Sequence, residues 1–105
     1  MSRGRLGLAA LVAIGLAAPA VAADPAWSAR KCTLYAEAWD HVRQGGGLDG
    51  VGADFVAAQD GFIASGCAQG RYCPRSDAET DLANTLSLMM MNEGVTGSFL
   101  PFGCP

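Results

Sequence analysis

Four cysteines in a short chain constrain this sequence more than any other feature. They are Cys32, Cys67, Cys73 and Cys104, in a chain of 105 residues. They follow Met1–Ala23, in which two arginines, an apolar run and a small-residue stretch form the pattern of a removable secretory signal. The sequence therefore predicts an exported protein, periplasmic or secreted. In that oxidising compartment the four cysteines are expected to form two disulfides.

The size of the remaining chain agrees with this prediction. Cleavage after Ala23 leaves residues 24–105, which are 82 residues and enough for a single small domain. A domain of this size buries only about 60% of its unfolded surface and often needs covalent staples. Each disulfide stabilises such a domain by about 2–4 kcal/mol.

Charge excludes some classes of partner. Once residues 1–23 are removed, five basic residues remain against ten acidic residues, which gives a net charge of −5. The basic patch of a nucleic-acid-binding protein is therefore not expected, and a basic protein partner suits this charge better. The apolar run is rich in Ala and Gly and contains Pro19, so we expect no stable membrane anchor after signal removal.

Apolar residues recur at helical spacing in three segments, which predicts an all-α fold. The helices are expected at about residues 25–43, 52–65 and 76–92, and Trp27 belongs to the apolar face of the first one. The segment from Val95 onward contains two prolines and two glycines and is expected to be irregular. The predicted fold is a small three-helix domain with two disulfides and an irregular C-terminal tail.

Several residues predict the ends of these helices. Asp24 can cap the first helix, and the glycines at 45–47 end it and form a flexible connector. Ser76 and Glu79 match the S-x-x-E capping box at the start of the third helix. Gly61 lies inside the second helix at a cost of about 1 kcal/mol. Such a glycine predicts close packing against a neighbouring helix.

Four cysteines allow three pairings. If the first two helices form an antiparallel hairpin, Cys32 lies beside Cys67. The third helix is about 25 Å long, and the residues that follow it reach about 36–40 Å when extended, so Cys104 can return to Cys73. We prefer Cys32–Cys67 with Cys73–Cys104. Cys32–Cys73 with Cys67–Cys104 is the runner-up, and a Cys67–Cys73 loop is short but not forbidden.

No convincing catalytic or metal-binding set emerges from the sequence. His41 is the only histidine, and a surface position near a helix C-terminus explains it. Catalysis would need partners within hydrogen-bond reach of His41, and the pattern predicts none. The cysteine spacing contains no C-x-x-C motif. We therefore predict no catalytic residue, no cofactor and no metal site, and a protein that is not an enzyme.

The apolar end of the third helix is the candidate partner surface. Met89 and Met90 are expected in the core, since methionine commonly fills core gaps, although soft copper ligands shared with His41 are the alternative. Met91 is harder to bury. The candidate surface consists of Leu88, Met91, Phe99, Leu100 and Phe102. The tail motif Phe99–Phe102 can instead cover the turn 88–91, which is the interpretation we favour over a partner there.

Three local motifs carry a family resemblance. They are the segment Gly61-Phe62-Ile63-Ala64-Ser65-Gly66, the pair Cys73-Pro74 and the terminal Pro101-Phe102-Gly103-Cys104. Together they resemble the Tai-type immunity proteins, which bind toxins delivered by type VI secretion. The first motif is also similar to HdeA-like acid-stress proteins. The chain departs from the immunity pattern at Gln59, where that pattern tends to place a cysteine. The resemblance implies a small helical periplasmic binder and transfers no functional residue.

The leading hypothesis is a non-enzymatic periplasmic protein that binds another protein, as an inhibitor of the immunity type or as an accessory module. The second is an acid-stress chaperone that exposes Leu88–Met91 or Phe99–Phe102 at low pH, since ten acidic residues make a pH response plausible. The third is a carrier of copper or of a small molecule.

Overall fold

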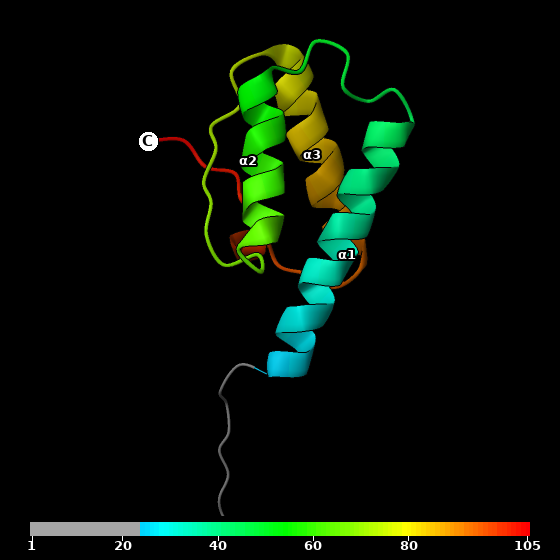
Figure 1. Cartoon of the computed structure of the whole chain (residues 1–105), viewed down its shortest axis with the longest axis vertical. Coiled ribbons are helices and arrows are strands. Elements are labelled where there is room, and N and C mark those ends of the chain that lie inside the picture. The colour runs from blue at the N-terminus through cyan, green and yellow to red at the C-terminus, as the bar shows by residue number, and fades with distance from the viewer. Residues whose placement is uncertain (1–23) are drawn as a thin grey trace, which may run out of the picture.

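The computed structural model describes residues 24–105, and the regular structure in that range is helical (Figure 1). Helix α1 spans Pro25–Gln44, α2 spans Ala53–Ala64 and α3 spans Asp77–Asn92. A short 3-10 turn, η2, follows at Gly97–Phe99. The predicted three-helix, all-α fold is confirmed, and the helix ends lie within two residues of the predicted ones. The predicted signal, residues 1–23, lies outside the described residues.

Helix α1 is the element that packs against both other helices. Figure 1 shows that α2 and α3 run in the same direction, opposite to α1. The hairpin expected for α1 and α2 is therefore present. Two neighbouring helices that run in parallel need a long connection, and residues 65–76 supply it by returning along the length of α2 (Figure 1).

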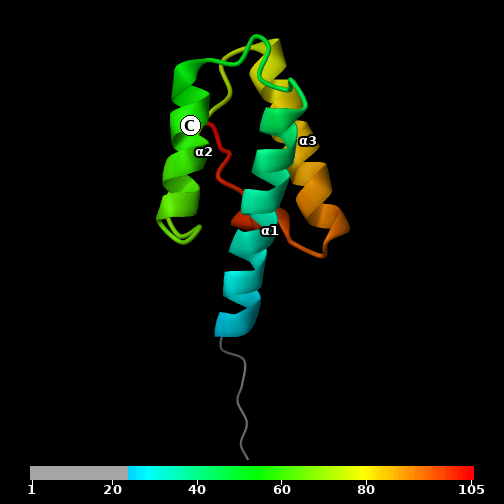
Figure 2. The same ribbon diagram turned by 45° about the vertical axis from the view of Figure 1, so that its right-hand side comes forward.

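The first turns of α1 extend beyond the ends of the other two helices (Figures 1 and 2). Residues 25–30 are all exposed, and the first buried residue of α1 is Leu34. Trp27 lies in this extension and is 39% exposed. The prediction that Trp27 belongs to the packed apolar face was therefore wrong, because no other helix reaches that far along α1.

The irregular tail is an interior element of the fold. Leu100 and Pro101 are buried, and Figure 2 shows the tail returning between α1 and α2. The amide of Tyr72 donates to the carbonyl of Pro101 at 2.8 Å, and the amide of Gly103 donates to the carbonyl of Tyr72 at 3.0 Å. The connector and the tail thus form one parallel bridge, Tyr72 with Phe102. These bonds satisfy backbone groups that would otherwise be buried without partners.

Two clusters of aromatic rings attach the tail to the helices. Phe99 contacts Tyr35 of α1 and Phe62 of α2 edge to face, with ring centroids 6.0 and 5.5 Å apart. Phe102 stacks on Phe55 of α2 at 5.8 Å. Such pairs contribute about 0.5–1.5 kcal/mol each beyond the area that they bury. The tail is therefore held by apolar contacts as well as by its disulfide.

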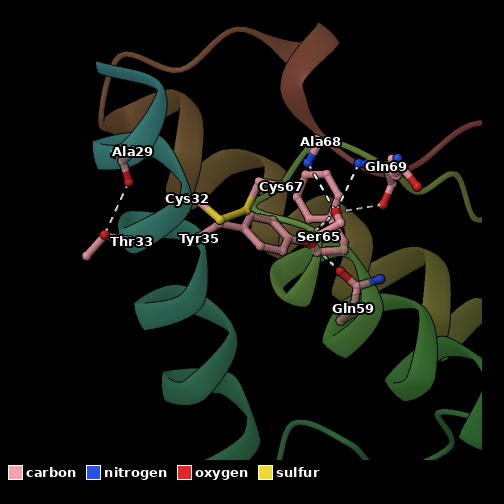
Figure 3. The surroundings of a disulfide bond; sticks show 10 residues. Ala29, Cys32, Thr33, Tyr35, Gln59, Ser65, Cys67, Ala68 and Gln69 are labelled. Atoms are coloured by element: carbon pink, nitrogen blue, oxygen red, sulfur yellow. Dashed lines mark hydrogen bonds between the residues drawn. A yellow bond between two sulfur atoms is a disulfide. The ribbon is translucent and has the colours of Figure 1, made fainter. Parts of the chain in front are cut away.

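The two disulfides pair as preferred from the sequence. Cys32–Cys67 joins α1 to the turn after α2, and Cys73–Cys104 joins the connector to the tail. The alternative pairings are wrong. Figure 3 shows how Ser65 shapes the turn that presents Cys67: its hydroxyl accepts from the amide of Gln69 at 3.0 Å and donates to the carbonyl of Phe62 at 2.7 Å.

The predicted capping residues are in place, with one difference. Asp24 accepts a hydrogen bond from the amide of Ala26 at 3.0 Å, and Ser76 accepts one from the amide of Glu79 at 3.1 Å. In a full capping box the Glu79 side chain would return to the amide of Ser76. The carboxylate of Glu79 instead turns into the protein, where it meets donors from other segments.

The glycines behave differently from what the sequence predicts. A Cβ built on Gly61 meets no atom within 4 Å, so the prediction of close helix packing there was wrong. The connector after α1 folds back on the helix end, since the amide of Gly47 donates to the carbonyl of Val42 at 3.0 Å. A Cβ on Gly47 would lie 2.7 Å from that carbonyl oxygen. Gly47 is thus required by a close backbone contact.

Candidate functional site

The residues of the candidate partner surface fall into an exposed group on α3 and a buried or half-buried group in the tail. Leu88 and Met91 are 62% and 48% exposed. Leu100 is only 8% exposed and belongs to the core, so its place in an exposed surface was wrong. Phe99 and Phe102 are half-buried against the same core. The division arises because the tail packs between the helices, a position that depends on long-range contacts.

The tail leaves most of the exposed turn of α3 uncovered. Of the tail residues, Gly97 lies near the methyl group of Met91, while the motif 99–102 packs against α1 and α2. Our preferred interpretation, that this motif covers the turn 88–91, is therefore wrong. Leu88 and Met91 are three residues apart on a helix, so their side chains lie on the same face.

The three consecutive methionines point in different directions, as expected on a helix. Met90 is buried in the core, Met89 is partly buried against it, and Met91 faces solvent. The core positions predicted for Met89 and Met90 are thus confirmed, the first of them in part. Met89 also reaches the surface of a groove that contains His41.

This groove lies between the end of α1, the glycine connector and α3. We call it the α1–α3 groove, and its volume is about 640 Å³. Its lining includes His41, Val42, Asp49, Asp81, Thr85 and Met89. Gly45 and Gly47 form part of its wall. The groove combines an apolar floor with polar groups at its edge, which is the usual composition of a binding site.

Both carboxylates of the α1–α3 groove are unengaged within residues 24–105. Neither Asp49 nor Asp81 forms an ion pair there, and neither side chain accepts a hydrogen bond from the described residues. The nearby cations are used elsewhere: Arg43 pairs with Asp60 at 3.0 Å, and Arg75 pairs with Asp54 at 2.8 Å. The groove therefore presents negative charge.

Part of this groove could have been found from the sequence. Asp81, Thr85 and Met89 are spaced by four residues, so a helix places them on one face. His41 and Asp49 could not be added in the same way. Asp49 reaches the groove because the glycine connector turns back over the end of α1, and that turn depends on backbone contacts that periodicity does not encode. His41 reaches it because the end of α1 packs beside α3, which is a long-range contact.

A buried carboxylate lies close to the groove and fixes its surroundings. Glu79 is 4% exposed. One of its oxygens accepts from the hydroxyl of Tyr72 at 2.8 Å and from the amide of Arg75 at 2.9 Å, and the other accepts from the amide of Gly52 at 2.9 Å. Glu79 thus ties the start of α2 and the connector to α3.

These contacts determine how Glu79 ionises. Burial raises its pKa, but hydrogen bonds from the amides of Arg75 and Gly52 and from the hydroxyl of Tyr72, together with the Arg75 charge, more than offset that effect. The pKa of Glu79 therefore lies below its ordinary value, and the ionised form is the one that the fold stabilises.

A second buried polar pair joins α1 to α2. The hydroxyl of Tyr35 donates to Oε1 of Gln59, as Figure 3 shows, and both side chains are fully buried. Burial raises the pKa of Tyr35 above its ordinary value, so the phenol stays a donor. The Nε2 group of Gln59 has no hydrogen-bond partner in the described part of the chain. Helical spacing from Phe55 and Phe62 puts Gln59 on the same buried face of α2, but it does not identify this partner.

The described residues lack the features of a metal site and of a membrane span. In residues 24–105 no three His, Cys, Asp or Glu side chains gather in a way that could hold a metal ion. No described helix is long and apolar enough to cross a membrane. No protein-family model, no curated protein and no solved structure matches this chain.

Proposed function

We propose that this chain is an exported, non-enzymatic module of the periplasm that binds another protein, as an inhibitor of the immunity type or as an accessory subunit. The observation that supports this most directly is the exposure of Leu88 and Met91 on one face of α3. Large apolar side chains on a common face are typical of protein–protein contacts, and methionine adapts to differently shaped partners.

The disulfide-linked core beneath this face favours binding. Two disulfides and two aromatic clusters hold α1, α2 and the tail together. Met90 is buried directly below the exposed turn and anchors it in the core. A surface that is already rigid loses little conformational entropy on association, so more of the contact energy becomes affinity. The disulfides also suit the oxidising compartment that we propose.

The proposal is tested by capturing partners from a periplasmic extract with the oxidised protein. A specific protein should be retained by the wild type and lost with Leu88→Ser/Met91→Ser. The matched control is Ala57→Ser/Ala64→Ser, which changes two exposed residues of α2. The captured protein is then purified and its affinity measured for all three forms. Absence of any retained protein, or equal retention by both variants, would contradict the proposal.

Glu79 favours a second candidate, the acid-stress chaperone. Its ionised carboxylate joins α2 and the connector to α3, and protonation weakens these hydrogen bonds. Acidification would then loosen the contact and expose apolar surface. Binding of a hydrophobic dye between neutral and acidic pH checks this candidate, and an unchanged dye signal removes it.

A further inference from the structure

We propose that the α1–α3 groove is where the partner protein inserts a basic segment, with arginine or lysine side chains between apolar ones. This inference rests on the proposed binding function and specifies the chemistry of the partner. It requires a groove of sufficient size, a negative rim that the protein does not itself neutralise, and continuity with the exposed apolar face of α3.

The size of the groove suits one or two long side chains. Its volume of about 640 Å³ lies within the range of about 300–1,000 Å³ that is typical of binding pockets. The neighbouring hollow between Leu34, Glu37 and Glu93 is smaller, at about 190 Å³. Gly47 is part of the wall of the larger groove, and a Cβ at this position would lie 2.7 Å from the carbonyl oxygen of Val42.

The charge of the rim selects a cation. Asp49 and Asp81 contribute two carboxylates that have no ion-pair partner within residues 24–105. The floor consists of Val42, Leu82 and Met89, which are apolar. Arginine and lysine have apolar stems and charged heads, so their stems can lie on this floor while their heads meet the rim. An acidic segment would be repelled there, and a purely apolar one would leave both carboxylates partly desolvated without a partner.

The groove is continuous with the face proposed above. Leu88 lies three residues beyond Thr85 and seven beyond Asp81, so all three residues lie along adjacent rows of α3. A partner segment that places a basic side chain in the groove can therefore place an apolar side chain on Leu88. The net charge of −5 outside residues 1–23 also accelerates the approach of such a segment.

The test measures how two peptides of defined composition bind to the oxidised mature protein, residues 24–105. One is an amphipathic helix of leucine and arginine, and the other carries glutamate at every arginine position. Binding is measured by titration, and the contact is mapped by the shifts of backbone amide resonances. The basic peptide should bind, with shifts concentrated at residues 41–49 and 78–89, and the acidic peptide should not.

Two variants that remove the same amount of charge locate the site. Asp49→Asn/Asp81→Asn should weaken binding of the basic peptide about tenfold. Glu37→Gln/Glu93→Gln removes two carboxylates beside the smaller hollow and should change the affinity less than about twofold. Circular dichroism and the melting temperature establish that both variants remain folded.

The outcomes separate this inference from the proposed function. No binding of the basic peptide overturns the groove as a basic docking site. Equal weakening by both variants overturns it too, because the attraction would then come from the general charge of the protein. If a partner is nevertheless captured through Leu88 and Met91, the proposed function stands and this inference alone fails. If the groove binds the basic peptide but the extract yields no partner, the proposed function fails instead.

Discussion

Glu79 shows how one residue can serve two segments at once. It belongs to a motif that starts a helix, yet its carboxylate holds the connector and the first residues of α2. A depressed pKa in the folded state means that ionisation and folding favour each other. The stability from this group is fully present above the pKa of an unfolded glutamate, about 4.3. It is lost as the pH falls through the lower folded value.

The first prediction concerns Glu79→Gln. The neutral amide cannot accept all of the hydrogen bonds, so we expect the free energy of unfolding at pH 7 to fall by about 1–3 kcal/mol. When the pH is lowered to acid values, through the folded pKa of Glu79, the wild type should lose this advantage, and the two proteins should converge. Denaturant unfolding at both pH values measures the effect. Glu37→Gln, which changes an exposed carboxylate, should show no such convergence, and a constant difference for Glu79→Gln would contradict the assignment.

The second prediction concerns the buried pair of Tyr35 and Gln59. Either single change, Tyr35→Phe or Gln59→Leu, leaves one buried group without its partner and should cost about 1–3 kcal/mol. The double variant removes both polar groups, together with the unpaired Nε2, and should be close to the wild type in stability. A double-mutant cycle by denaturant unfolding gives the coupling, and strictly additive effects would show that the pair is not a unit.

At the scale of elements, the helices and the tail differ in how far sequence reasoning reaches. The helix ends depend on local signals, such as Asp24 and Ser76, whose partners lie two or three residues away. The tail depends on Tyr72 and Phe55, which are distant in sequence. Its irregularity could therefore be predicted, but its burial could not. The same limit applies to the α1–α3 groove, because Asp49 reaches it through a turn of glycines and His41 through the packing of α1 against α3.

The third prediction compares two glycines of different elements. Gly61→Ala should stabilise the protein by about 0.5–1 kcal/mol, because an added methyl group meets open space and alanine favours the helix. Gly47→Ala should destabilise it by about 1–3 kcal/mol, because the methyl group meets the backbone of Val42. Thermal and denaturant unfolding of both variants measure these changes, and effects of the same sign would refute the explanation.

At the scale of the whole molecule, the two disulfides close separate loops in consecutive parts of the chain. Cys32–Cys67 closes a loop with a sequence separation of 35, and Cys73–Cys104 closes one with a separation of 31. Loops of such similar length are expected to restrict the unfolded chain to a similar degree. Their number and their preferred pairing followed from spacing and helix length. The core that they enclose required the full set of long-range contacts.

The fourth prediction follows from these loops. Replacing either cysteine pair by serine should lower the free energy of unfolding by about 3–4 kcal/mol. Removing both pairs should leave the chain largely unfolded at 37 °C, because small disulfide domains keep little stability without their staples. Melting curves of each double variant, and of the wild type with reductant, test this. A reduced wild type that melts as the oxidised protein does would contradict it.

The buried position of Leu100 and Pro101 also sets the order in which the molecule can assemble. The chain is made from its N-terminus, so all three helices are synthesised before the segment that fills the space between α1 and α2. Until that segment joins the fold, the aromatic side chains of α1 and α2 that it contacts stay uncovered. A chain truncated before Leu100 would therefore lack the side chains that fill this space in the core.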